Sequence, residues 1–366
     1  MRVRSVLASL ACIALLPQGA SAEPSVRVRV REGVHSVRLS GSALRVEGRP
    51  VKVRELLATA ERGRIRVADL ATRSPVRIAG ARGVSVDGHH YPGRLALLPH
   101  ASAGMDVVNI VPLEVYVVRS LAREIYESWP EAVLKAQAVV TRSYALHQRA
   151  RPGARAFDLE ASVVSQRYGG GPVSARLRQA GRETRGEYLS WRHEPILAVF
   201  HASAGGRTAS AREVWGEELP YLRSVESPDA EAPDHFWSFE LARGDLLRSL
   251  REVGLRPGSG EPVRVLERSA TRRVRELRVG KAVVSGRELR QILGGRAIRS
   301  ALFEVRTEGD RVRFLGSGAG HGVGLSQWGA RELARRGLDY REILAHYYPG
   351  TRLERLDPAR ELSALP

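Results

Sequence analysis

Apolar and polar residues alternate along several short stretches between residues 26 and 97, and this pattern limits that part of the chain to β-structure. The first stretch, Val26 to Arg31, reads Val-Arg-Val-Arg-Val-Arg. A period of two places the valines on one face of a strand and the arginines on the other. We therefore expect short strands with one buried face and one solvated face. The pattern continues in further stretches separated by Gly and Pro residues: residues 37–39, 44–46, 64–67, 76–78 and 95–97.

The pattern changes near residue 105, and the segment from Val107 to Arg149 has mostly helical character. Ser128 and Glu131 match a capping box at the start of a helix within it. The mixture of helices and strands that follows favours an α+β fold over a regular βαβ alternation. The helices that we expect cover residues 113–125, 130–149, 244–253, 327–336 and 340–347, with strands such as 186–190, 195–200, 263–266 and 276–279.

The first 22 residues have the features of an export signal. Arg2 and Arg4 precede a short apolar run, Val6 to Leu16, and Ala20-Ser-Ala22 fits a cleavage site before Glu23. No later stretch approaches the roughly 20 apolar residues that span a bilayer, so we expect no transmembrane anchor after cleavage. We expect an exported protein of the periplasm, cell wall or extracellular space, organised as a signal peptide (1–22), a β-rich accessory region (23–104), a catalytic domain (105–353) and a flexible tail (354–366).

Cysteine content and charge restrict the chemistry. Cys12 lies inside the expected signal, so the mature chain has no disulfide, no Cys-ligated metal and no Cys nucleophile. The formal net charge is +18, and only three of the 58 basic residues are lysines. The arginines are spread along the whole chain and no nucleic-acid motif appears. We therefore expect anionic wall polymers or membrane surfaces as partners, and no nucleic acid.

Glu124 is the first candidate for chemistry. It lies at the C-terminal end of the first expected helix, and Tyr126 and Trp129 follow it. The negative end of the helix dipole and the nearby aromatic rings both favour the protonated carboxyl, which a general acid requires. A surface glutamate paired with Arg119 or Arg123 is the alternative interpretation.

A glycine-rich segment, Gly318 to Gly329, is the second candidate. Five glycines in its twelve residues surround His321, Ser326 and Gln327. Glycines let a ligand approach the backbone, so the segment fits the wall of a sugar pocket, with a tight structural turn as the alternative. It lacks the Gly-Lys-Ser/Thr ending of a phosphate-binding loop and any Rossmann context.

A strand end that turns into a loop, His201 to Thr208, is the third candidate. His201 and Ser203 would point the same way on an extended strand. Because there is no Gly-x-Ser-x-Gly elbow and no third group, we do not expect a serine hydrolase. Gln166 and Tyr168 fit either a carbohydrate groove or an ordinary loop, and no His-Glu-x-x-His metal motif is present.

Together these segments resemble the stage II sporulation protein D family, also called SpoIID/LytB, over roughly residues 105–352. The resemblance implies a mixed helix and sheet catalytic domain behind the β-rich region. The pieces that carry it, in order, are Glu124 to Ala145 (beginning Glu-Ile-Tyr-Glu-Ser-Trp-Pro), Ser165-Gln-Arg-Tyr168, His201 to Thr208 with Val214-Trp-Gly216 and Pro220-Tyr-Leu222, Gly318 to Ala330, and His346-Tyr-Tyr-Pro-Gly350.

The resemblance implies a peptidoglycan lytic transglycosylase that cleaves the β-1,4 bond between N-acetylmuramic acid and N-acetylglucosamine and leaves a 1,6-anhydro ring. It assigns Glu124 as the general acid/base, needs no cofactor, and implies glycan partly stripped of stem peptides and an amidase partner. One carboxyl suffices because the sugar's own C6 hydroxyl attacks C1. The substrate-binding residues that it suggests are Gln137, Arg142, Tyr144, Ser165, Gln166, Tyr168, His201, Ser203, His321, Ser326 and Gln327.

The sequence departs from the family at two places. Some relatives carry cysteine and bind zinc in the stretch matching His201 to Thr208, where this chain has Ser203 and no thiol, so we expect no metal. Ile125-Tyr126 replaces the Met-Pro common after the glutamate. Three alternatives stay open: a non-catalytic wall-binding amidase enhancer, a hydrolysing muramidase using Glu127 or Asp158 as a second carboxylate, and a nucleic-acid binder suggested by charge alone.

Overall fold

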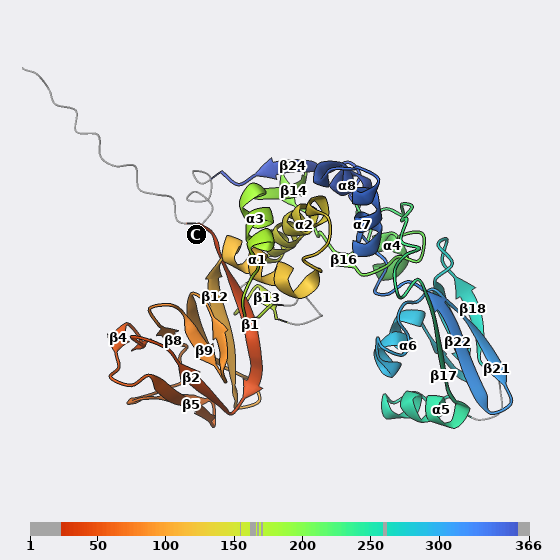
Figure 1. Cartoon of the computed structure of the whole chain (residues 1–366). Helices are drawn as coiled ribbons and strands as arrows, with labels where there is room; N and C mark the ends of the chain where they lie inside the picture. The colour runs from red at the N-terminus through yellow and green to blue at the C-terminus, as the bar shows by residue number, and fades with distance from the viewer. Residues whose placement is uncertain are drawn as a thin grey trace, which may run out of the picture.

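The computed structural model describes residues 23–153, 155–161, 166, 168–169, 171–258 and 262–357 (Figure 1). The expected signal peptide, Ser165 and residues 358–366 lie outside the described residues. In Figure 1 the helices α1, α2 and α3 lie between a strand-rich N-terminal part and a second strand-rich unit drawn in cyan and blue. The α+β fold class that the sequence predicts is confirmed.

The N-terminal part consists of two sheets that bury their inner faces in one core. Their strand orders are β13-β1-β12-β11-β8-β3-β4 and β10-β9-β2-β5-β6-β7. Val26 and Val28 of β1 are fully buried, while the residues that follow each of them, Arg27 and Arg29, are partly exposed, as the alternation predicts. The strands are β1 (Ser25–Val34), β2 (Ser36–Ser40), β3 (Arg45–Val46), β4 (Arg49–Pro50), β5 (Glu55–Glu61), β6 (Arg64–Val67), β7 (Leu70–Thr72), β8 (Val76–Ala79), β9 (Val84–Val86), β10 (His89–Tyr91), β11 (Arg94–Pro99), β12 (Met105–Pro112) and β13 (Leu159–Glu160).

Strand β12 corrects an expectation of the sequence analysis. It pairs with β1 and β11, although mostly helical character was predicted from Val107 onward. The first five residues of β12 are all buried, so the strand shows none of the polar alternation that marks its neighbours. Because β12 belongs to the first sheet, the domain boundary expected at residue 104 does not coincide with a break in the fold.

Two central helices, α1 (Leu113–Glu124) and α2 (Glu131–Ala150), pack against each other and against the core of the N-terminal sheets. The capping box predicted from Ser128 and Glu131 is wrong, because Pro130 is the N-cap of α2 and makes no side-chain cap bond. Proline is tolerated at a helix start, since the first amides have no intrahelical partner. No helix within the described residues is both long and apolar enough to cross a membrane.

The remaining elements of the main body surround these helices. They are α3 (Ala175–Glu183), β14 (Glu187–Trp191), β15 (Glu194–Pro195), β16 (Phe200–His201), α4 (Ala211–Trp215), β23 (Leu325–Ser326), α7 (Gln327–Arg335), α8 (Tyr340–Tyr347) and β24 (Arg352–Arg355). Strand β24 pairs with β14 through residue 355, so the flexible tail expected from residue 354 begins too early.

A second unit, residues 236–317, has its own core, although one catalytic domain was predicted over residues 105–353. Leu250, Leu289 and Phe314 are among its buried residues. Its first and last residues, Phe236 and Ser317, pair with each other, so the unit is an insertion in the main body. Its elements are β17 (Phe236–Ala242), α5 (Arg243–Glu252), β18 (Arg264–Arg268), β19 (Val274–Val279), β20 (Ala282–Val284), α6 (Gly286–Leu293), β21 (Phe303–Glu308) and β22 (Arg311–Ser317).

Arg142 and Glu114 form an ion pair inside the main core. The Arg142 side chain is 0% exposed, and its Nε and Nη2 donate to the two carboxylate oxygens of Glu114 at 2.8 and 2.6 Å. Its Nη1 donates to the carbonyl oxygen of Glu187 at 2.8 Å, so the pair joins α1, α2 and β14. The family resemblance implied that Arg142 binds substrate, but full burial in this ion pair gives it a structural role.

We predict that Glu114→Ala destabilises the protein strongly. Removing one partner of a buried ion pair costs about 3–5 kcal/mol, because the remaining charge stays buried without compensation. The free energy of unfolding in urea measures this loss. Glu218→Ala is the control, since it removes an exposed ion pair with Arg212 and should leave the urea midpoint unchanged. A Glu114→Ala protein as stable as the unmodified chain would contradict the structural role.

Candidate active site

A cleft of about 890 Å³ lies between the central helices and the second unit. One wall is formed around the C-terminal end of α1, another by the loops that follow β16 and precede α7, and a third by α6. Five of the residues predicted from the sequence line it: Glu124, Tyr144, His201, His321 and Gln327.

Backbone pairing brings the His201 segment and the glycine-rich segment together. Strand β16 runs parallel to β23, with His201 opposite Ser326, and Ser203 forms a bridge with Ala319. Every second residue of the glycine-rich segment from Gly318 to Gly324 has a positive φ, which favours glycine: φ is 77° at Gly318, 112° at Gly320, 81° at Gly322 and 71° at Gly324. A Cβ on Gly320 would lie 2.6 Å from the His201 Cβ, so the close approach of the two segments requires glycine there.

Glu124 is the last residue of α1 and is partly buried at the cleft. The backbone that carries it is fixed by Gln327, whose Nε2 donates to the Glu124 carbonyl oxygen at 2.9 Å and to Gln137 Oε1 at 3.2 Å. Gln137 is fully buried on α2. Both glutamines were predicted to bind substrate, and the structure gives them contacts that position the end of α1.

Aromatic rings line the cleft that contains Glu124. Tyr126 and Trp129 have ring centroids 5.3 Å apart, and Trp129 meets Trp328 edge to face at 5.0 Å. Trp215 lies 5.5 Å from the His321 ring. All four line the cleft, and Tyr126 is 64% exposed. Aromatic walls with a few convergent polar groups are typical of small-molecule and sugar sites.

The two cleft histidines are held uncharged. His201 Nδ1 lies 3.1 Å from the Val323 carbonyl oxygen and must therefore carry the proton. Burial, followed by the neighbouring His321 and Arg273, places the pKa of His201 well below its usual value. His321 donates from Nε2 to the Phe200 carbonyl oxygen at 2.9 Å and accepts from the Val323 amide at Nδ1. Burial, with Coulombic repulsion from nearby arginines, lowers the pKa of His321 to about 4.

A zinc site of the kind implied by the family does not fit these residues. Among described residues His201 Nε2 and Ser203 Oγ are buried without a hydrogen-bond partner, but a hydroxyl is a poor substitute for thiolate. Both nitrogens of His321 are engaged within the protein. No group of three potential His, Cys, Asp or Glu ligands occurs in the part of the chain that is described.

The other predicted residues lie away from the cleft surface. Gln166 accepts from the Tyr116 hydroxyl at 2.8 Å, and the buried Tyr168 donates to Asn109 at 2.6 Å, with its ring stacked on Tyr116. Both contact Tyr116 of α1 and neither lines the cleft, so the structure does not support the predicted role in a carbohydrate groove. Ser326 is fully buried as the N-cap of α7, and Ser203 is buried in the loop pairing.

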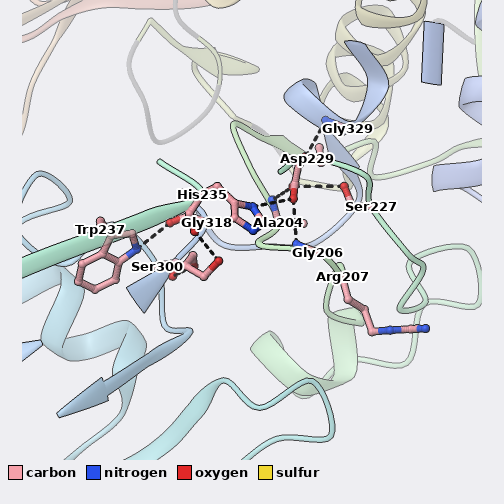
Figure 2. Close-up of polar contacts among 12 residues, drawn as sticks. Ala204, Gly206, Arg207, Ser227, Asp229, His235, Trp237, Ser300, Gly318 and Gly329 are labelled. Carbon is pink, nitrogen blue, oxygen red and sulfur yellow. Dashed lines mark hydrogen bonds and ion pairs between the residues drawn. The ribbon is translucent and has the colours of Figure 1, made fainter. Parts of the chain in front are cut away.

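Asp229 is an organising residue that the sequence analysis missed (Figure 2). Its buried carboxylate accepts from the backbone amides of Ala204 and Gly206, the latter at 2.8 Å. It also accepts from the hydroxyls of Ser326 at 2.9 Å and Ser227 at 3.3 Å. One carboxylate therefore joins the His201 loop to the start of α7. Its sequence context, Ser-Pro-Asp, is typical of an exposed turn, so no local signal marks it.

The second unit is attached to the same loops. Arg273 is buried, and its Nη2 donates to the carbonyl oxygens of Ala204 and Arg207, both at 3.0 Å. Trp237 Nε1 donates to the Gly318 carbonyl oxygen at 3.0 Å, as Figure 2 shows. The unit thus contacts both loops that carry the cleft histidines.

We predict that Asp229→Ala destabilises the protein by about 3 kcal/mol or more, because it removes the acceptor of the Ala204 amide and of the Ser227 and Ser326 hydroxyls, which belong to buried residues, and of the Gly206 amide. Urea unfolding measures the loss. Asp229→Asn keeps one acceptor oxygen and should retain part of the stability. Equal stability of the unmodified and Asp229→Ala chains would remove Asp229 from this organising role.

We also predict that His321 makes folding stability depend on pH. Between pH 6.5, the usual value for an unfolded histidine, and pH 4, the unfolded chain binds a proton here that the folded chain does not. Stability therefore falls on acidification, by about 3 kcal/mol for this residue. Urea unfolding at pH 7 and pH 4 should show a smaller loss for His321→Gln, whereas the exposed control His90→Gln should follow the unmodified chain. Parallel losses in all three proteins would refute the prediction.

Comparisons with known proteins identify the family of the chain. A family model described as "Stage II sporulation protein" matches residues 101–191. An uncharacterized protein of Brachyspira hyodysenteriae is 30% identical over 270 residues, 73% of each chain. The stage II sporulation protein D of Bacillus subtilis is 28% identical over 70% of this chain and 78% of its own. The amidase enhancer of Bacillus subtilis is 26% identical over 64% of this chain and 39% of its own length. The chain therefore belongs to the stage II sporulation protein D family.

Proposed function

We propose that this protein is an exported peptidoglycan lytic transglycosylase in which Glu124 is the general acid/base. The observation that carries the proposal is the place of this carboxyl: it is partly buried at the end of α1, in a cleft with aromatic walls, beside the glycine-rich histidine loop. The basic surface charge and the N-terminal signal pattern support a site of action in the periplasm or cell wall.

The reaction needs one carboxyl. Glu124 in its protonated form donates its proton to the glycosidic oxygen as the bond from C1 of N-acetylmuramic acid to that oxygen breaks. The C6 hydroxyl of the same sugar attacks C1, and the Glu124 carboxylate accepts the hydroxyl proton. The products are a 1,6-anhydro-muramoyl end and a free C4 hydroxyl on N-acetylglucosamine. Glu124 ends the cycle protonated, and no water is consumed.

A hydrolysing muramidase would need a second carboxylate, and the two suggested by the sequence are poorly placed. Asp158 is buried in an ion pair with Arg27 at 2.7 Å and lies outside the cleft. Glu127 is exposed and is not part of the lining. Of the other acidic residues that line the cleft, Asp234 pairs with Arg299, which leaves the exposed Glu217 as the candidate for that role.

A non-catalytic amidase enhancer is the second candidate function, and the relative with that name favours it. Such a protein would bind glycan in the same cleft and stimulate an amidase, without using the acidity of Glu124. It differs from the enzyme in one measurable respect, the release of anhydro products.

We predict that Glu124→Gln abolishes release of 1,6-anhydro products from purified, peptide-free glycan strands, because an amide cannot donate and then accept the transferred proton. Loss of general acid/base catalysis lowers the rate by at least about 10²–10⁴-fold. Mass spectrometry of the digest measures the products, and thermal unfolding verifies the fold. Glu127→Gln, an exposed change three residues away, is the matched control and should keep its activity.

The outcomes separate the candidates. Unchanged turnover by Glu124→Gln removes the assignment of the catalytic residue. Reducing ends in place of anhydro ends, lost in Glu217→Gln, would identify a hydrolysing muramidase. Stimulation of an amidase by both the unmodified chain and Glu124→Gln, with no strand cleavage by either, would identify the enhancer.

A further inference from the structure

Arginines of the second unit face the cleft and a hollow that adjoins it. Arg287 and Arg290, on α6, line the cleft. Arg290 also lines the hollow of about 470 Å³, together with Arg296 and Arg299. Figure 1 shows α6 on the side of its unit that is turned toward the central helices. The cleft thus has the Glu124 wall on the main body and an arginine wall on the insertion.

Most of these arginines have no acidic partner. Arg299 forms an ion pair with Asp234. Within the described residues, Arg287, Arg290 and Arg296 form no ion pair. Arg287 has Glu288 beside it, but that carboxylate is engaged with the Ser285 amide in the capping box of α6. The arginine wall therefore carries an excess of positive charge.

Contacts within the second unit hold the Arg290 side chain in place. Its Nε donates to the Arg299 carbonyl oxygen at 3.1 Å, which leaves the two Nη groups for other partners. Burial lowers the pKa of Arg290, and no acidic residue offsets that cost. A Cβ on Gly295 would lie 2.9 Å from Arg290 Nη2, so the absent side chain makes room for the guanidinium. The neighbouring Leu289 is fully buried in the core of the unit and anchors α6.

A fixed, partly desolvated guanidinium without a counter-ion favours binding of an anion, and its planar fork matches a carboxylate. Given the proposed function, the anion would belong to the glycan strand. N-acetylglucosamine has no charged group. The muramoyl sugar carries a lactyl carboxylate when its stem peptide is absent, and carboxylates of the peptide when it is present.

We propose that Arg287 and Arg290 form a carboxylate-binding subsite that sets the register of the strand, and this inference rests on the proposed function. Every bond in the strand is β-1,4-linked, so linkage alone does not tell the enzyme which bond to place at Glu124. Only alternate sugars carry the carboxylate. Binding it on the α6 wall fixes which sugar lies at the catalytic carboxyl.

The test measures binding to the full chain carrying Glu124→Gln, so that strands stay intact. Four ligands are compared: peptide-stripped strands, the same strands with their lactyl carboxylates converted to neutral methylamides, peptide-bearing strands, and chitohexaose, which has no carboxylate. The variants are Arg287→Gln, Arg290→Gln and Arg290→Lys. The control is Arg251→Gln, an exposed arginine on α5 of the same unit.

We expect stripped strands to bind about tenfold or more tightly than neutralised strands, since the subsite forms charge-assisted hydrogen bonds. Arg287→Gln and Arg290→Gln should remove this preference and leave chitohexaose affinity unchanged, while Arg290→Lys should restore part of it. A loss confined to peptide-bearing strands also supports the subsite and assigns it to stem-peptide carboxylates.

Two results would overturn the subsite. One is equal affinity of the unmodified chain for stripped and neutralised strands, together with unchanged binding of peptide-bearing strands by the arginine variants. The other is an equal loss of affinity for chitohexaose in those variants, which indicates damage to the groove as a whole. Failure of every ligand to bind any of these proteins would reject the proposed function as well, whereas binding without dependence on Arg287 and Arg290 rejects the subsite alone.

Discussion

The carboxylate of Asp229 joins segments of the main body that are far apart in sequence, and the geometry of the cleft depends on that junction. It accepts hydrogen bonds from the loop after His201 and from Ser326, which begins α7. The next residue, Gln327, binds the backbone of Glu124. A short chain of contacts therefore runs from the buried Asp229 to the end of the helix that carries Glu124. Because buried donors are costly to leave unsatisfied, these contacts fix the loops rather than merely linking them.

The electrostatics of the cleft follow from which charges are paired. On the main body, Arg142 and Glu114 neutralise each other inside the core, and both histidines are held uncharged by burial. On the insertion, three arginines that line the cleft or the adjoining hollow, Arg287, Arg290 and Arg296, form no ion pair among the described residues. Glu124 thus shares a cleft with neutral imidazoles and an arginine wall. Such a cleft is suited to a ligand that is mostly neutral and carries an anion at one side, which is how an alternating glycan strand is built.

The sequence predicts much of this molecule, and its failures have physical causes. Alternation identified strands such as β6, whose faces differ, but not β12, because burial on both faces removes the period of two. Residue type and spacing found Glu124 and His321, since glycines and a helix end are local features. The same reasoning wrongly predicted that Arg142 and Gln166 bind substrate. The sequence does not distinguish a polar residue whose hydrogen bonds are satisfied inside the core from one that faces a ligand. Asp229 and the second core depend on long-range contacts, which no local pattern contains.

Hydrogen bonds connect the insertion to the loop that carries His321. This connection helps to fix the spacing between the two walls of the cleft. Strand β22 ends at Ser317, directly before Gly318, and the Gly318 amide donates to the carbonyl oxygens of Asp234 and His235 on the incoming segment. Trp237 binds the carbonyl of the same glycine, and Arg273 binds the loop after His201. These hydrogen bonds couple the position of the arginine wall to the loops that hold the histidines. A glycan strand bound through its carboxylate at α6 would lie at a set distance from Glu124. Carboxylate recognition on the insertion would then determine which bond reaches the catalytic carboxyl on the main body.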